Sequence, residues 1–207
     1  MEKKISENII DLLGDIGEVA LDSFLNEGLL KDIPFFGTGI KVIKLYTNIS
    51  DTIMLRKIVL FMQNLNSCKQ CEIDDFINKM NSDKYRKEIG VKLISIIDKI
   101  DEDIKIKWIA KTFLDYLSKK ITKDFFFRII TIINNSFTQD ILKLTIIAEK
   151  NKILSFNKKV ESYILYQLFS NGLLDDCGID GGAASDDDSG TIFVLNDFGN
   201  YIFKNLL

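Results

Sequence analysis

Apolar residues recur at helical spacing along most of the chain. The spacing holds in the stretches 9–25, 40–47, 53–65, 82–100, 103–117 and 123–133. A period near 3.6 residues places apolar side chains on one face of a helix that packs against a core. The pattern therefore predicts a mainly α-helical protein built as a multi-helix bundle.

Several helix boundaries can also be predicted from the sequence. Ser82 is a good N-cap for a helix that runs to about Ile100, because its hydroxyl can accept a hydrogen bond from the first turn. Thr138 is predicted to cap a helix whose core side extends to Ile147. A further helix is expected from Phe156 to Asn171, ending at Gly172.

The pattern changes after this helix. Residues 175–190 form an acidic, glycine-rich stretch that predicts a loop, and Thr191–Leu195 reads as a strand. Ile179 is expected in a partner strand, and Asn196 or Asp197 is expected to cap a terminal helix. The order of helix, loop, strand and helix predicts a small winged-helix-like C-terminal α/β segment.

These patterns predict three regions. Residues 1–66 form an N-terminal helix–elbow–helix region, residues 72–150 a helical bundle, and residues 156–207 the winged-helix-like segment. At 207 residues the chain can also fold as one compact unit, and this alternative stays open.

The elbow is the run 28–39, which contains the only proline of the chain, Pro34. Proline disfavours helix at the residue before it, so a corner between two helices is expected here. The apolar side chains of the elbow are Leu29, Leu30, Ile33, Phe35 and Phe36. A corner buried under the bundle is the favoured interpretation, and a contact with a protein partner or a membrane surface is the alternative.

The composition argues against common catalytic chemistry. The chain has no histidine, which excludes Ser-His-Asp and Cys-His triads and histidine-ligated zinc. Cys68 and Cys71 form a single CxxC pair in a polar stretch, and Cys177 is far away in sequence. We therefore expect reduced thiols, no catalytic residues, no metal and no cofactor, and a protein that is not an enzyme.

Charge is unevenly distributed. Residues 172–207 contain seven Asp and one Lys, a net charge of −6, whereas the rest of the chain carries +3. The acidic loop comprises Asp175, Asp176, Asp180, Asp186, Asp187 and Asp188. Its spacing departs from a calcium-binding EF-hand loop at the fifth and sixth positions, so a solvated loop is expected rather than a metal site.

Nucleic-acid binding requires a basic face. Lysine and arginine gather in two places, Lys119, Lys120, Lys123 and Arg128 in one and Lys150, Lys152, Lys158 and Lys159 in the other. The second group adjoins the helix that could act as a recognition helix, but the acidic wing would repel phosphate. Mixed solvated faces explain these lysines more simply than nucleic-acid binding does.

The N-terminus is too polar for a signal peptide, and no stretch is long and uncharged enough to span a bilayer. A cytoplasmic location is expected, with peripheral membrane contact as an alternative.

Three short segments stand out by their residues rather than by their period. They are Ala20–Ser23 with Gly28–Pro34 and Gly37–Thr38, then Ser50–Ile58, and finally Val194–Gly199. Together they resemble a family of bacterial helical proteins of unestablished function. The last segment is similar to the Leu-Thr-x-x-Gly step that closes many bacterial winged-helix modules. The general likeness to abortive-infection alpha type proteins implies a phage-defence or mobile-element context, and it implies no catalytic residues.

The leading functional expectation is a non-enzymatic protein-interaction or regulatory component with a protein partner or self-association. A membrane-associating effector that uses residues 28–47 is one alternative. A DNA-binding winged-helix regulator is the other. No small-molecule substrate is indicated by the sequence.

Overall fold

A computed structural model describes residues 49–65, 83–181 and 189–207, which form parts of two compact units. Unit 1 spans residues 1–122 and unit 2 spans residues 123–207. The boundary between the units falls inside the region 72–150 that the sequence suggested as one bundle. The elbow at 28–39 and the Cys68–Cys71 pair lie outside the described residues.

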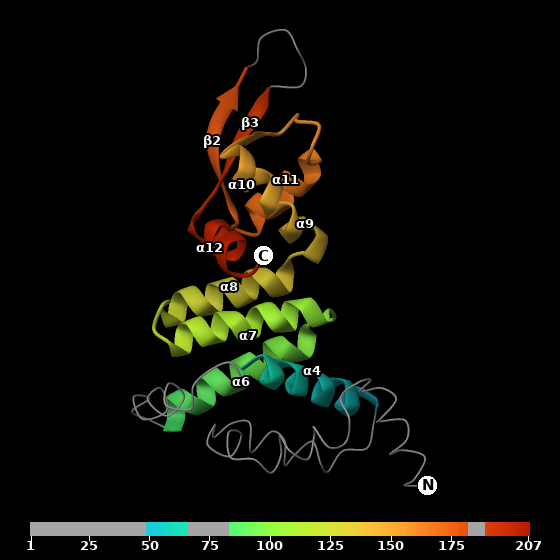
Figure 1. Ribbon diagram of the computed structural model, residues 1–207, viewed down its shortest axis with the longest axis vertical. Coiled ribbons are helices and arrows are strands. Elements are labelled where there is room, and N and C mark those ends of the chain that lie inside the picture. The colour runs from blue at the N-terminus through green and yellow to red at the C-terminus, as the bar shows by residue number, and fades with distance from the viewer. Residues whose placement is uncertain (1–48, 66–82, 182–188) are drawn as a thin grey trace. The chain divides into compact units, whose positions relative to one another are not determined.

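The described part of unit 1 contains three helices. They are α4 (Ile49–Leu65), α6 (Asp83–Lys99) and α7 (Asp103–Leu117), and α4 packs against both of the others (Figure 1). Their shared core is apolar and includes Ile58, Phe61, Leu65, Ile89, Leu93, Ile97, Ile106, Ile109 and Phe113. The helical period in these stretches is confirmed.

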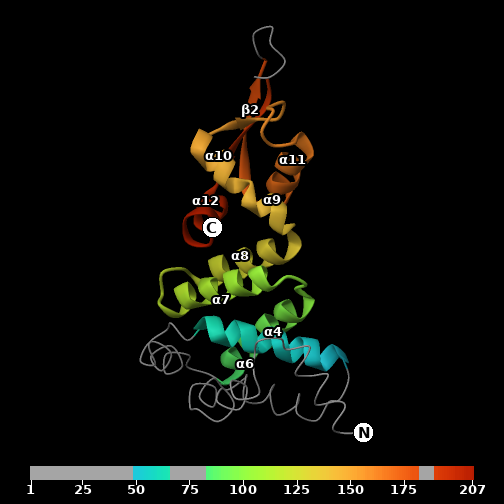
Figure 2. The ribbon, with the colours of Figure 1, turned by 45° about the vertical axis from the view of Figure 1, so that its right-hand side comes forward.

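Unit 2 combines helices with a small sheet. In chain order it contains α8 (Lys123–Asn135), α9 (Thr138–Leu142), α10 (Leu144–Lys150), β1 (Ile153–Leu154), α11 (Ser162–Ser170), β2 (Leu174–Asp180), β3 (Gly190–Leu195) and α12 (Asp197–Asn205). Figure 2 shows α10 and α11 to the left and right of the strands. The prediction of a mainly helical protein with a winged-helix-like C-terminal α/β segment is confirmed.

The sheet is antiparallel throughout, with strand order β1–β3–β2. Phe193 of the central strand is fully buried, and its register partners are Ile153 on β1 and Asp176 on β2. The predicted wing had only two strands. The short strand β1 was missed because two residues are too few to show an alternating pattern.

The helix that the sequence suggested from Thr138 is in fact two short helices. Helix α9 ends at Leu142, and α10 begins at Leu144. Phe137, not Thr138, occupies the N-cap position, and the side chain of Phe137 makes no capping hydrogen bond. The backbone N–H of Lys143 donates to Asp140 and Ile141 carbonyls, a tight turn that ends α9.

The expected helix from Phe156 is also corrected, because α11 begins only at Ser162. Asn157 explains the delay. Its Oδ1 accepts hydrogen bonds from the backbone N–H groups of Lys159 at 2.7 Å and Val160 at 2.8 Å, and its Nδ2 donates to the Leu154 carbonyl at 2.7 Å. An asparagine that binds the nearby backbone in this way favours a turn over a helix.

The acidic stretch is corrected in its first part. Residues 175–180 belong to β2, so Asp175, Asp176 and Asp180 lie on a strand and not in a loop. The expectation that Ile179 belongs to the partner strand is confirmed. Asp186, Asp187 and Asp188 lie outside the described residues.

The end of the chain follows the predicted capping. Asn196 Oδ1 accepts hydrogen bonds from the backbone N–H groups of Phe198 and Gly199, each at 3.0 Å, which caps α12. A Cβ at Gly199 would overlap the backbone oxygen of Leu173. Glycine at this position therefore allows the start of α12 to approach the segment that leads into β2.

Candidate docking surface

Helix α11 carries apolar residues on more than one face. Ile164, Leu165 and Leu168 are buried in unit 2. Three aromatic residues remain outside, with exposed fractions of 71% for Tyr163, 47% for Tyr166 and 41% for Phe169. Their i, i+3, i+6 spacing makes a continuous aromatic stripe along the helix. We call this stripe the aromatic face.

One side of the aromatic face is anchored on β3. The ring of Tyr166 meets the ring of Phe193 edge-on, with centroids 5.2 Å apart, and Phe169 lies 5.8 Å from the same ring. The Tyr166 hydroxyl is also 3.0 Å from Thr191 Oγ1. These contacts fix the orientation of two aromatic side chains that still keep much of their surface in solvent.

The register of the sheet adds residues of β2 to the same surface. Ile179 is the partner of Thr191, and Asp176 is the partner of Phe193. Residues directly opposite each other in an antiparallel pair project to the same sheet face. Because Thr191 and Phe193 contact α11, Ile179 and Asp176 belong to the sheet face on which α11 lies.

This surface is apolar and carries few charges. Ile179 is 80% exposed. Neither α11 nor β2 contains Lys or Arg. Asp176 is the acidic residue of β2 on this face, because Asp175 pairs with Val194 and Asp180 pairs with Gly190, which places both on the opposite face. Exposed aromatic and aliphatic side chains beside a charged rim are typical of a site that binds another protein.

The first group of basic residues suggested by the sequence is divided between the two units. Lys119 and Lys120 belong to unit 1, whereas Lys123 and Arg128 belong to unit 2. Lys120 Nζ forms an ion pair with Asp115 Oδ1 at 2.9 Å, a contact within unit 1. Lys158 and Lys159 are exposed in the turn before α11. Lys150 and Lys152, also exposed, precede the short strand β1.

One acidic residue of β2 makes a local hydrogen bond. Asp176 Oδ1 accepts a hydrogen bond from the backbone N–H of Gly178 at 2.8 Å. Within residues 49–65, 83–181 and 189–207, no three cysteine or acidic side chains are placed to share a metal ion. Cys177 is exposed on the same strand.

The elbow residues Leu29, Leu30, Ile33, Phe35 and Phe36 lie outside the described residues. Their assignment as a buried corner, a partner contact or a membrane contact stays a prediction. Among the helices that are described, none is long and apolar enough to cross a bilayer.

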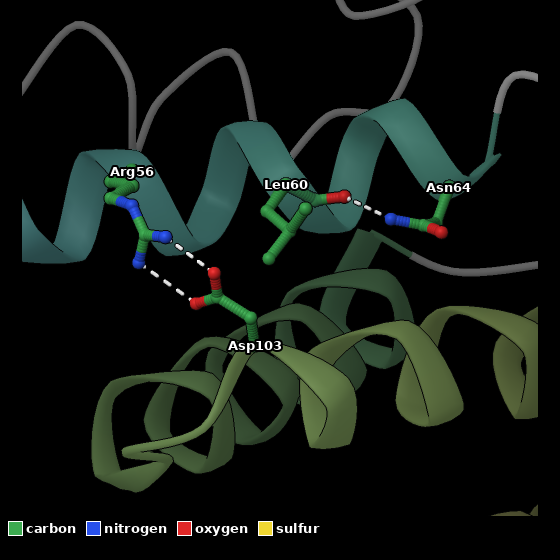
Figure 3. Close-up of polar contacts among 4 residues, drawn as sticks. All are labelled: Arg56, Leu60, Asn64 and Asp103. Atoms are coloured by element: carbon green, nitrogen blue, oxygen red, sulfur yellow. Dashed lines mark hydrogen bonds and ion pairs between the residues drawn. The ribbon is translucent and has the colours of Figure 1, made fainter. Parts of the chain in front are cut away.

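The segment Ser50–Ile58 contains two neighbouring basic residues, Arg56 and Lys57, and both make structural contacts in unit 1. Arg56 of α4 makes a two-pronged ion pair with Asp103 at the start of α7, with one N–O distance of 2.8 Å (Figure 3). Lys57 Nζ donates to the Asp98 carbonyl at 2.6 Å. Both basic residues therefore tie α4 to neighbouring helices, and Asp103 is the partner of Arg56 at the start of α7.

A titratable group lies near the start of α11. Burial raises the pKa of the Asp140 carboxyl, the negative charge of Glu161 raises it further, and Lys143 opposes both. Glu161 is the N-cap residue of α11. The raised pKa of Asp140 makes the stability of unit 2 depend on pH.

Comparison with protein-family models, with curated proteins and with solved structures found no match. The evidence for function therefore comes from the residues and their arrangement.

The sequence analysis missed the aromatic face. A signal for it was present, because Ser162–Ser170 has no charged residue and its apolar residues lie on more than one side of the helix. Apolar residues on several sides of a short helix indicate that more than one side is covered, by the fold or by another molecule. In unit 2 the fold covers only the face that carries Ile164, Leu165 and Leu168.

Proposed function

We propose that the chain is a non-enzymatic interaction protein that binds a protein partner through the aromatic face of α11. The observation that carries the proposal is the exposure of Tyr163, Tyr166 and Phe169 beside Ile179. The resemblance to abortive-infection proteins extends the proposal to a phage-defence or mobile-element context.

The composition of the surface supports a protein partner. Tyr and Phe are enriched at protein interfaces, where they add large contact areas with few rotatable bonds. Interfaces are depleted of charge at their centre, and α11 has no charged residue between Ser162 and Ser170. Tyr163 is the most exposed of the three aromatic residues, so its ring has the most surface for a partner to cover.

A photocrosslinking experiment tests this proposal. Benzoylphenylalanine replaces Tyr163 in the full-length chain, and the same group replaces Ile104 of α7 as a control at an exposed apolar position of unit 1. In cells of the source organism, we expect an adduct that forms from position 163 and not from position 104. The captured protein is then purified, and its affinity for the unlabelled chain is measured.

With the purified partner, Tyr163→Ala should weaken binding at least about tenfold, because interface aromatic residues often dominate affinity. Tyr163→Phe should retain most of the affinity because it keeps the ring. Absence of an adduct at position 163, or equal effects of the two substitutions, would contradict the proposal.

DNA binding is the second candidate, supported by the order β1, α11, β2, β3 and by the exposed Lys158 and Lys159 just before α11. In winged-helix proteins the helix before the hairpin commonly enters a DNA groove. The aromatic face and the Asp residues of β2 oppose this role because they offer phosphate no positive charge.

Fluorescence anisotropy with labelled duplex DNA separates the two candidates. We expect no binding at low salt. Binding that weakens with salt and is lost in Lys158→Ala/Lys159→Ala would favour the DNA candidate instead.

A further inference from the structure

The link between α11 and β2 contains the one Asn-Gly step of the sequence, at Asn171 and Gly172. Asparagine loses its side-chain amide most readily when glycine follows it, because glycine has no side chain to hinder attack by its own backbone nitrogen. Whether the step reacts in the folded chain depends on how the fold holds the attacking nitrogen and the amide group.

The reaction requires water and no other reactant. The Gly172 backbone nitrogen attacks Cγ of Asn171, and the new C–N bond closes a cyclic imide. The side-chain nitrogen leaves as ammonia and takes the proton that the Gly172 amide loses. Water then opens one of the imide carbonyls, which leaves aspartate or isoaspartate at position 171.

The fold holds each group that this reaction needs. The Gly172 N–H donates to the Phe169 carbonyl at 2.8 Å, and Asn171 has ψ of −2°, which turns the Gly172 nitrogen away from the Asn171 side chain. Asn171 Nδ2, the leaving nitrogen, donates to Ser136 Oγ at 2.8 Å. Asn171 Oδ1 accepts from Gln167 Nε2 at 3.3 Å. The attacking nitrogen, the leaving nitrogen and the amide oxygen are therefore all bonded in place.

Ser136 provides the contact that is best shielded from water. It is only 2% exposed and lies between α8 and α9, far from Asn171 in sequence. Gln167, in contrast, is exposed on α11. A hydrogen bond to a buried group is costly to break, because that group then lacks a partner. We therefore expect the Ser136 contact to contribute most to holding the amide.

We propose that Asn171 is a deamidation site that the fold of unit 2 keeps closed, and that opening of the hydrogen bond to Ser136 makes it reactive. The inference is independent of the proposed function. It assigns to Ser136 the role of protecting Asn171 from a covalent change.

The products would weaken the same contacts. Aspartate at position 171 lacks the N–H groups that donate to Ser136, and its negative charge lies at the C-terminal end of α11, where the helix dipole opposes it. Isoaspartate adds a carbon to the main chain next to Gly172, whose carbonyl accepts from Asn196 Nδ2 at 3.0 Å. Deamidation should therefore loosen the end of α11 that carries Phe169 of the aromatic face.

Peptide mapping by mass spectrometry tests the inference on the full-length chain at neutral pH. In guanidinium chloride we expect Asn171 to react before the other asparagines, including Asn151, which is exposed in the folded chain. In the folded chain the rate at Asn171 should fall at least about tenfold, because reaction then requires local opening.

Substitutions separate the Ser136 contact from the general stability of unit 2. Ser136→Ala should accelerate deamidation of the folded chain about fivefold, the effect of one lost hydrogen bond. Ile147→Val is the matched control, because it removes a buried methyl group of α10 at a similar cost in stability and leaves the bonds of Asn171 intact. Gln167→Ala, at an exposed position, should accelerate the reaction less than Ser136→Ala and serves if Ser136→Ala does not fold.

Three results would overturn the inference. The first is a rate at Asn171 that is similar in the folded and unfolded wild type. The second is faster reaction of another asparagine in guanidinium chloride. The third is equal acceleration by Ser136→Ala and Ile147→Val, or, where Ser136→Ala does not fold, no acceleration by Gln167→Ala.

Discussion

Helices α7 of unit 1 and α11 of unit 2 each carry three aromatic residues, but the two sets differ in their exposure to solvent. Trp108, Phe113 and Tyr116 of α7 are buried. The aromatic face of α11 is largely in solvent. The two helices differ in what surrounds them, so aromatic content by itself does not locate a binding surface.

The surroundings of α7 account for the difference. It packs closely on α4, where Phe61 and Phe113 have ring centroids 5.9 Å apart. Its polar residues are also satisfied locally, as Thr112 Oγ1 donates to the Trp108 carbonyl at 2.8 Å. Helix α11 instead buries one face against unit 2 and leaves the other for solvent or a partner. An aromatic residue that its own unit leaves uncovered is the better functional candidate.

The largest effect is expected when one aromatic residue is substituted in each of the two helices. Phe113→Ala should destabilise unit 1 by about 3–5 kcal/mol, because a buried ring is lost and a cavity remains. Tyr163→Ala should change stability by less than about 0.5 kcal/mol, since its ring is mostly in solvent. Urea unfolding measures both, with Trp108, the single tryptophan, reporting on unit 1 and amide hydrogen exchange reporting on unit 2. Similar losses would show that α11 is not a free surface.

The second test concerns the close approach at the end of unit 2. Gly199→Ala should destabilise that unit by about 1–3 kcal/mol, because the added methyl group overlaps the Leu173 backbone oxygen. Gly181→Ala is the matched control, since a Cβ there meets no atom within 4 Å. Hydrogen exchange of α12 amides measures the difference. Tolerance of Gly199→Ala would contradict the contact.

A smaller effect is expected from the ion pair that joins α4 to α7. The Arg56 and Asp103 side chains are 35% and 43% exposed, so solvent screens their attraction. A double-mutant cycle with Arg56→Met and Asp103→Asn should give a coupling of about 0.5–1 kcal/mol. The coupling should fall in high salt. A coupling energy larger than the destabilisation caused by Phe113→Ala would show that this ion pair stabilises unit 1 more than the packing of the buried ring does.

The smallest effect is a pH dependence in unit 2. The raised pKa of Asp140 means that the folded chain holds this proton more tightly than the unfolded chain. Stability is therefore lost as pH rises from the ordinary carboxyl value of 3.8 through the raised pKa. Asp140→Asn should remove this loss. The stability of the variant relative to the wild type should therefore increase as pH rises through the raised pKa, and it should then stay constant. A gain that grows towards acid pH would contradict the assignment.

The sequence was most informative where a helix is long and has one apolar side. The boundaries of α6, α7 and α8 follow from the spacing of Ile, Leu and Phe, and Asn196 was recognisable as a cap because its chemistry is local. The break at Lys143 and the late start of α11 were not recognisable. Both depend on backbone hydrogen bonds that compete with a helix of similar propensity.

Some features of the candidate surface likewise follow from the sequence, and others follow only from the tertiary structure. Local spacing determined that residues 162–170 form a helix and that Thr191–Leu195 form a strand. Only the tertiary structure decided which apolar side of α11 is covered, and only the register with β3 placed Asp176 and Ile179 on the same sheet face as that helix. Periodicity reports that a side chain is apolar, whereas burial depends on which distant segments pack against it.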